Sequence, residues 1–204
     1  MKRVLIASSN PGKLRDFAAV AARHGVEVEL LPNFKMLPEA VEDGETFQEN
    51  ARIKAEHYSR YAPGRLVLAD DSGLEVEYLN GAPGVRSARY AAGTEHGNSD
   101  DLANNSLLLE RMNGVPDDQR GAQFVCIIAI ARDGKTLSSF RGEARGLLLH
   151  SPRGSGGFGY DPLFYFPDLH KSFAELTPRE KAGVSHRGAA FGKFLEWCDQ
   201  RQEI

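Results

Sequence analysis

The stretch VLIASSNPGKLRDFAAVAARHGVEVEL at residues 4–30 decides the fold class. Residues 4–7 are apolar and predict a buried strand, and a turn at residues 8–12 follows it. From residue 13 to about residue 24, apolar side chains recur at three- and four-residue spacing, which predicts an amphipathic helix. Residues 26–30 predict a second short strand. Strand, glycine-containing turn, helix and strand together begin an α/β fold.

The rest of the chain predicts a mixed α/β protein with antiparallel strands in its second half. Thr46 with Glu49, and Thr177 with Glu180, form capping boxes that begin helices, and Ser185 caps a last helix. A further helix is predicted at residues 99–112, and residues 80–98 are predicted to be mostly loop. Strands are predicted at residues 66–69, 74–78 (an edge strand), 122–131, 136–142 (running on through 147–149) and 163–166.

Composition limits the class of protein. The chain has 204 residues, 41% of them hydrophobic and 26% charged, as in an ordinary soluble globular domain. The net charge of −3 and the lack of a basic-aromatic stripe argue against a nucleic-acid-binding protein. The N-terminal apolar run is too short for a signal peptide, and no 18-residue apolar run predicts a membrane span. Two distant cysteines suit a reducing compartment, so we expect a cytoplasmic protein.

The turn at residues 8–13, Ser8-Ser9-Asn10-Pro11-Gly12-Lys13, is a candidate phosphate site. Exposed N–H groups at a helix start, together with a lysine, favour an anion. The turn lacks the spacing of a Walker A motif. An ordinary turn with a helix cap is the structural alternative.

Adjacent carboxylates at Asp70 and Asp71 follow the apolar strand at residues 66–69. Ligands often bind at the ends of strands in α/β sheets, and two neighbouring carboxylates repel each other unless a cation relieves them. The pattern therefore indicates a magnesium site, with a polar turn as the alternative. An acidic loop at residues 39–45 offers further oxygen ligands or is a solvated loop.

Two further segments suit a base and a phosphate. Glycines around Phe158 allow a flat ring to approach the backbone closely. Lys181, with Ser185, His186 and Arg187 at a helix start, can read a phosphate or a carbonyl. A flexible hairpin and a capped helix with surface charges are the respective structural alternatives.

In combination, these stretches resemble the inosine/xanthosine triphosphate pyrophosphatase family. The matching segments follow one another in the family's order and span nearly the whole chain: SSNPGK (8–13), TFQENARIKA (46–55), ADDSG (69–73), GAPGVRSARY (81–90), GFGYDPLF (157–164) and ELTPREKAGVSHRG (175–188). The resemblance implies an α/β fold with an elongated, twisted mixed β-sheet flanked by helices. It also implies one domain over residues 1–204, with two packed lobes, a central substrate cleft and a homodimer.

The resemblance further implies magnesium-dependent hydrolysis of inosine, deoxyinosine and xanthosine triphosphates to the nucleoside monophosphate and pyrophosphate. Asp71 matches the family's proton acceptor and magnesium ligand. In place of two successive glutamates, the acidic loop has Val41-Glu42; Glu42 is the expected second metal ligand, and Glu39 and Asp43 stay open. The implied substrate contacts are Ser8, Ser9, Asn10, Pro11, Gly12, Lys13, Lys54, Ser72, Phe158, Gly159, Tyr160, Asp161, Lys181, His186 and Arg187.

Base selection follows from the 6-keto group of hypoxanthine and xanthine, which accepts hydrogen bonds where adenine has an amino donor. Donors from His186, Arg187 or nearby backbone would favour the keto group and oppose adenine. Two alternatives stay open: a septum-associated type of nucleotide pyrophosphatase with another base preference, and a nucleotide sensor without catalysis.

Overall fold

The computed structural model describes residues 2–92 and 99–201, which form two compact units. Unit 1 comprises the chain up to Asp71, then Cys126–Glu143, and the chain from Ala182 onward. Unit 2 comprises Ser72–Val125 and Ala144–Lys181. Within the described part of the chain, no helix has the length and apolar character that a membrane span requires.

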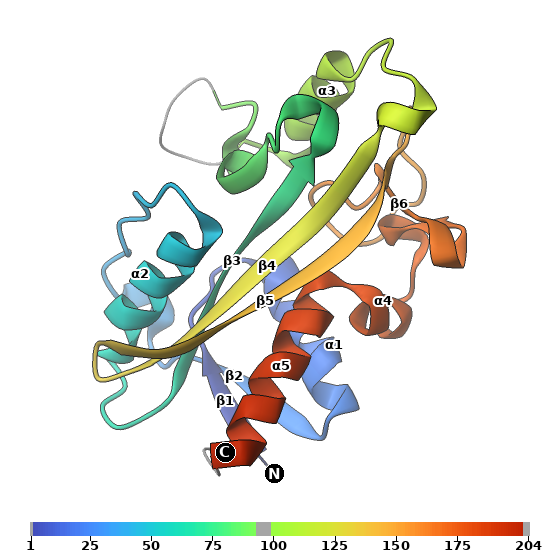
Figure 1. Cartoon of the computed structure of the whole chain (residues 1–204). Coiled ribbons are helices and arrows are strands. Elements are labelled where there is room, and N and C mark those ends of the chain that lie inside the picture. Colours follow the sequence, from blue (N-terminus) through green and yellow to red (C-terminus); the bar gives the residue numbers. More distant parts are fainter. Residues whose placement is uncertain (1, 93–98, 202–204) are drawn as a thin grey trace. The chain divides into compact units, whose positions relative to one another are not determined.

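One mixed sheet contains the seven strands found in the described residues, in the order β2-β1-β3-β4-β5-β6-β7 (Figure 1). β1 pairs in parallel with β2 and β3, whereas β5, β6 and β7 pair antiparallel. The predicted mixed α/β class is therefore confirmed. The strands are β1 (Lys2–Ile6), β2 (Val26–Leu30), β3 (Val67–Val76), β4 (Gly121–Arg132), β5 (Lys135–Leu148), β6 (Phe164–Phe166) and β7 (Lys171–Ser172).

Three helices begin where the capping residues predict, whereas α1 begins at Pro11 and not at residue 13, and α3 at Asp101 and not at residue 99. The Thr46–Glu49 box begins α2, and hydrogen bonds between Thr177 and Glu180 precede α4. Ser185 Oγ accepts from Gly188 N over 3.1 Å at the start of α5. The α-helices are α1 (Pro11–Arg23), α2 (Phe47–Ser59), α3 (Asp101–Arg111), α4 (Pro178–Val184) and α5 (His186–Arg201).

β3 corrects two predictions, a strand end at residue 69 and a separate edge strand at residues 74–78. β3 continues from Val67 through both aspartates to Val76, and it lies between β1 and β4 in the sheet. Pairing with neighbouring strands overrides the turn preference of Asp, Ser and Gly. Gly73 serves a close approach instead of a turn, because a Cβ there would collide with the Ser87 hydroxyl and the Gly84 carbonyl.

Other differences are smaller. The segment predicted as loop contains a 3₁₀ helix at Gly84–Arg89, and its residues 93–98 lie outside the described part of the chain. β5 runs on to Leu148, as predicted, and β7 was not predicted. Two residues are too few to give an alternating pattern that sequence reasoning can detect.

In unit 1, helices cover both faces of the strands. Ile6, Leu68 and Ile128 belong to a core that includes Phe17 of α1 and Phe191 of α5, whose rings are 6.0 Å apart. Alternate residues of a strand point to opposite faces, so Val67 and Ala69 face away from this core. The buried side chains of α2 pack on that second face, and Figure 1 shows α2 apart from α1 and α5.

Candidate active site

The loop between β1 and α1 has the geometry of a capped helix start. Asn10 is the N-cap of α1, and its Oδ1 accepts from Lys13 N over 3.0 Å. Pro11 follows at the first helical position, where its missing N–H costs nothing. Ser8 is buried, and its Oγ accepts from Asn10 N over 3.3 Å. The structure thus gives Asn10 the structural role of a cap, with Lys13 in the first turn behind it.

Lys13 forms a buried ion pair with Asp70 of β3. Lys13 Nζ lies 2.9 Å from Asp70 Oδ2, and only 1% of the Asp70 side chain is exposed. Burial raises the pKa of Asp70, but the positive charges of Lys13 and Arg187 outweigh this and bring the pKa below its ordinary value. Asp70 is therefore ionised, and it holds the Lys13 ammonium beside the loop at residues 8–13.

Asp71, the next residue, makes a separate pair with Lys54 of α2. Lys54 Nζ lies 3.2 Å from Asp71 Oδ1 and 2.7 Å from Glu42 Oε2. Because successive strand residues point to opposite faces, Asp70 and Asp71 meet different lysines. Burial raises the pKa of Asp71 above its ordinary value, although the charges of Lys54 and Lys13 oppose the shift. The two aspartates therefore do not act together as ligands of one cation: Asp70 pairs with Lys13, and Asp71 pairs with Lys54.

A carboxylate pair suited to a divalent cation is nonetheless present. Asp71 and Glu42 approach the same ammonium group, so their oxygens gather around a position that already attracts a cation. Within residues 2–92 and 99–201, no three His, Cys, Asp or Glu side chains gather as a metal site of their own. Magnesium is commonly held by one or two carboxylates together with substrate phosphates, so this donor set fits it.

His186 and Arg187 begin α5 in unit 1, and both are buried. Arg187 Nη1 lies 3.1 Å from Asp16 Oδ2 of α1, which fixes the guanidinium. Gly142 of β5 lets the helix start approach the strand closely, because a Cβ there would collide with the His186 carbonyl and Ala190 N. The SHR motif is therefore held against the sheet and is not a solvated helix end.

Unit 2 contains the remaining predicted site residues, and among them Phe158 and Lys181 contact the carboxylate of Asp161. Asp161 Oδ2 accepts from Lys181 Nζ over 2.6 Å and from Phe158 N over 2.9 Å. Lys181 Nζ also lies 5.0 Å from the centre of the Phe158 ring, a cation–π contact. Gly157 allows this turn, since its φ is +72° and a Cβ would collide with the Asp161 carboxylate. The segment is a turn held by side-chain hydrogen bonds, with a half-buried aromatic ring, and not a flexible hairpin.

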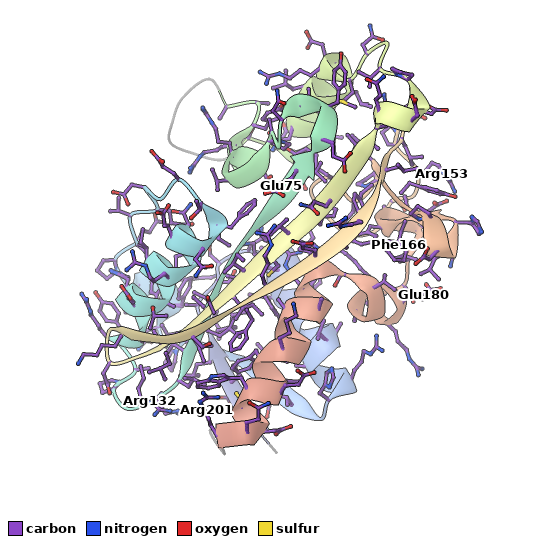
Figure 2. All side chains as sticks on the ribbon, in the orientation of Figure 1. Glu75, Arg132, Arg153, Phe166, Glu180 and Arg201 are labelled. Carbon is purple, nitrogen blue, oxygen red and sulfur yellow. The ribbon has the colours of Figure 1, made fainter. Side chains whose placement is uncertain are left out.

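Lys181 is placed by α4, which begins at Pro178. Glu180, labelled in Figure 2, accepts from Thr177 N and from Lys171 Nζ, and these contacts lower the pKa of Glu180 to about 2. Two other predicted site residues of unit 2 lie elsewhere. Tyr160 is buried, and its hydroxyl donates a hydrogen bond to the Ser87 carbonyl over 2.9 Å. Ser72 lies on β3, directly after Asp71, and is half-buried.

The predicted residues thus form two groups, one in each unit. The group in unit 1 contains the residue 8–13 loop, Glu42, Lys54, Asp71, His186 and Arg187; the group in unit 2 contains Ser72, the residue 158–161 turn and Lys181. That one ligand contacts both groups stays a prediction. Sequence reasoning missed the partners Asp16 and Asp70 in these roles, because neither belongs to a recognisable spacing with Arg187 or Lys13.

Comparisons with known proteins match this chain over nearly its full length. The model of the Ham1 family matches residues 4–197. The dITP/XTP pyrophosphatase of Acidobacterium capsulatum is 52% identical over 194 residues, which cover 93% of this chain and 95% of that protein. The dITP/XTP pyrophosphatase of Geobacillus kaustophilus is 47% identical over 200 residues, covering 98% and 96%.

A solved structure agrees. The structure of the Staphylococcus aureus Ham1 protein aligns with a TM-score of 0.81 at 38% identity, covering 98% of this chain and all of that one. A family model that spans most of the chain and relatives above 40% identity leave the relationship in no doubt. The chain belongs to the Ham1 family.

Proposed function

We propose that the protein hydrolyses inosine, deoxyinosine and xanthosine triphosphates between the α and β phosphates, releasing the nucleoside monophosphate and pyrophosphate. The observation that carries this proposal is the pairing of the largely buried Asp71 with Lys54, which also contacts Glu42; the three side chains combine a proton acceptor, a cation and a second carboxylate. The names of the relatives in Acidobacterium and Geobacillus support the same reaction and the same class of base.

Asp71 is the proposed proton acceptor for the attacking water. A carboxylate with an ordinary pKa is a weak base at neutral pH, and the raised pKa of Asp71 brings it closer to the working pH. Asp71 and Glu42 would hold Mg²⁺, which acidifies water and screens phosphate charge when it is bound. Glu42 is favoured over Glu39 and Asp43 because it contacts Lys54, the lysine that also contacts Asp71.

Lys13, Lys54 and the start of α1 are proposed to bind the triphosphate. Both lysines are largely buried and already paired with carboxylates, so their ammonium groups are held before any ligand binds. Fixed cations stabilise charge that develops on departing pyrophosphate without reorganising at the moment of reaction. Most of the rate enhancement in such a site comes from positioning and electrostatics.

The group in unit 2, with His186 and Arg187, is proposed to bind the nucleoside. The Phe158 ring offers a surface for stacking, and Lys181 is held against it by Asp161. The proposal also includes the features that the family resemblance implies: two lobes with a substrate cleft, a homodimer and a cytoplasmic location.

Pyrophosphate release from a panel of nucleoside triphosphates tests the reaction. We expect strong release from inosine and xanthosine triphosphates with magnesium, and loss of release with a chelator. Release chiefly from canonical pyrimidine triphosphates would instead assign the chain a septum-associated type of specificity. Tight binding without any release would identify a nucleotide sensor.

Lys13→Ala separates the phosphate role from the nucleoside role. We expect the Kd of inosine triphosphate to rise about 10- to 100-fold, the range for a lost hydrogen bond to a charged group, and the Kd of inosine to change less than about twofold. Isothermal titration calorimetry with both ligands, in the presence of a chelator so that no hydrolysis occurs, measures this. The exposed Lys35 offers the control Lys35→Ala, which should change neither value. Equal losses for both ligands would contradict a phosphate role for Lys13.

A further inference from the structure

Two side chains of α3, Asp101 and Asn105, hold both peptide groups of Gly159. Gly159 N donates to Asp101 Oδ2 over 2.7 Å, and Asn105 Nδ2 donates to the Gly159 carbonyl over 3.0 Å. Residues four apart lie on the same side of a helix, so the two side chains form one clamp, which we call the α3 clamp. We propose that the α3 clamp positions the segment Phe158–Tyr160 for the purine and thereby sets base selectivity; this inference rests on the proposed function.

Gly159 is the residue of this segment that most needs to be fixed. Its φ of +59° lies in the left-handed region, and glycine has no Cβ to restrict rotation about its backbone. The neighbours are anchored elsewhere: Phe158 N donates to Asp161, and the Tyr160 hydroxyl donates to the Ser87 carbonyl. The α3 clamp holds the two peptide planes between these anchors, and so it fixes the backbone that carries the Phe158 ring.

Burial of the Asn105 amide has an energetic cost, and its hydrogen bond to Gly159 accounts for an amide at this position. The residue is 7% exposed, and within the described residues its buried Oδ1 accepts no hydrogen bond. A buried amide oxygen without a partner is unfavourable, and a leucine of similar volume would avoid that cost. The contact that requires an amide at this position is therefore the bond from Asn105 Nδ2 to the Gly159 carbonyl.

The helix that carries the clamp is itself held in place. Asp100 caps α3 by accepting from Ala103 N over 2.7 Å. Asn104 Oδ1 accepts from Ala91 N over 2.9 Å and from Ser99 Oγ over 2.7 Å, which ties α3 to the segment before it. Because Asn104 ties α3 to that segment, Asp101 and Asn105 act as fixed points and not as side chains that follow the loop. They are positioning residues, since they act on the substrate through Gly159 and Phe158.

Asn105→Leu is the first test. We expect the KM for inosine triphosphate to rise roughly tenfold and the preference for inosine over adenosine triphosphate in kcat/KM to fall roughly tenfold, as the loss of one buried hydrogen bond predicts. The Ki of inorganic tripolyphosphate should change less than about twofold, because it probes the phosphate contacts of unit 1. A general loss of structure would raise both values together.

Asp101 gives a matched set of variants. Asp101→Ala should reproduce the effect of Asn105→Leu, whereas Asp101→Asn retains an acceptor oxygen for Gly159 N and should restore most of the selectivity. Asp100→Ala is the control, because it removes the cap of the same helix without touching Gly159. It should lower stability by about 1 kcal/mol, or roughly fivefold in the folding equilibrium, and leave base selectivity unchanged.

Three results would overturn the α3 clamp: wild-type selectivity in Asn105→Leu, equal changes for inosine triphosphate and tripolyphosphate, or the same loss of selectivity in Asp100→Ala. A wild-type protein that releases no pyrophosphate from any nucleotide would overturn the proposed function instead. Calorimetric binding of inosine and adenosine triphosphates to the same variants, measured with a chelator so that no hydrolysis occurs, then tests the α3 clamp independently of catalysis.

Discussion

Asp71→Asn is expected to lower kcat for inosine triphosphate at least about 10³-fold. An amide cannot accept the proton of the attacking water, and it is a weaker ligand for a divalent cation than a carboxylate. General base catalysis alone contributes about 10²- to 10⁴-fold, and the loss of charge at the cation adds to this. Steady-state pyrophosphate release with magnesium measures the change.

The same variant is expected to keep or gain stability. Burial raises the pKa of Asp71, so its ionised form is less favourable in the folded protein than in the unfolded chain at neutral pH. Asparagine removes that charge, while Lys54 keeps its 2.7 Å contact with Glu42. We therefore expect lost activity with a melting temperature equal to or above that of the wild type. This combination indicates a residue that serves function and lowers stability.

The exposed Asp118 supplies a control, since Asp118→Asn removes the same charge from the surface. It should leave kcat unchanged. Turnover near the wild-type value in Asp71→Asn would remove Asp71 as both base and metal ligand. Lost activity with a collapsed melting temperature would show instead that the carboxylate is needed for the fold.

Local signals in the sequence predicted several elements of unit 1 well. The strand Val26–Leu30 has the predicted bounds, and Thr46 and Ser185 cap helices as predicted. These features depend on a few neighbouring residues, so the sequence contains all of their physical cause. The continuation of β3 through Asp70 depends on pairing with distant strands, and there the local turn preference gave the wrong answer.

The candidate site also contains residues that the sequence predicted and residues that it did not. Spacing and resemblance found the residues that carry charge or a ring, such as Lys13 and Phe158. The residues that position them were not predicted, because Asp16, Asp70 and Asn105 act on partners far away in the chain. Asp16 and Asn105 belong to no recognised motif, and Asp70 was predicted only as part of an acidic pair for magnesium. Only the folded structure shows which backbone or charged group each one holds.

Arg120 is the strongest example of a role that only the structure shows. It is 2% exposed, and its guanidinium donates to four carbonyls within unit 2. Nε donates to Leu148 over 2.8 Å and Nη2 to Leu149 over 3.0 Å, while Nη1 donates to Met112 over 3.0 Å and to Val115 over 3.3 Å. The side chain therefore joins the end of β5 to the turn that follows α3.

Arg120→Met is expected to lower the free energy of unfolding by about 3–5 kcal/mol. Methionine retains much of the length and apolar contact of the side chain, but it removes a donor from all four carbonyls. The Met112 carbonyl keeps its bond from Val115 N, and each buried group left without a partner costs about 1–3 kcal/mol. These costs are less than additive, because the segments relax and water reaches some of them. At about 2–4 °C per kcal/mol, the melting temperature should fall by roughly 6–20 °C.

Urea unfolding followed by circular dichroism measures the loss, and Arg111→Met in the same unit is the matched control. Arg111 is exposed and donates to the Tyr90 hydroxyl over 3.1 Å, so we expect its replacement to cost less than about 1 kcal/mol. Arg120→Lys should fall between the two, because one ammonium has three donors but lacks the planar fork that reaches both segments. If Arg120→Met unfolds at the urea concentration of the wild type, the four carbonyls find other donors, and the guanidinium is not what joins the two segments.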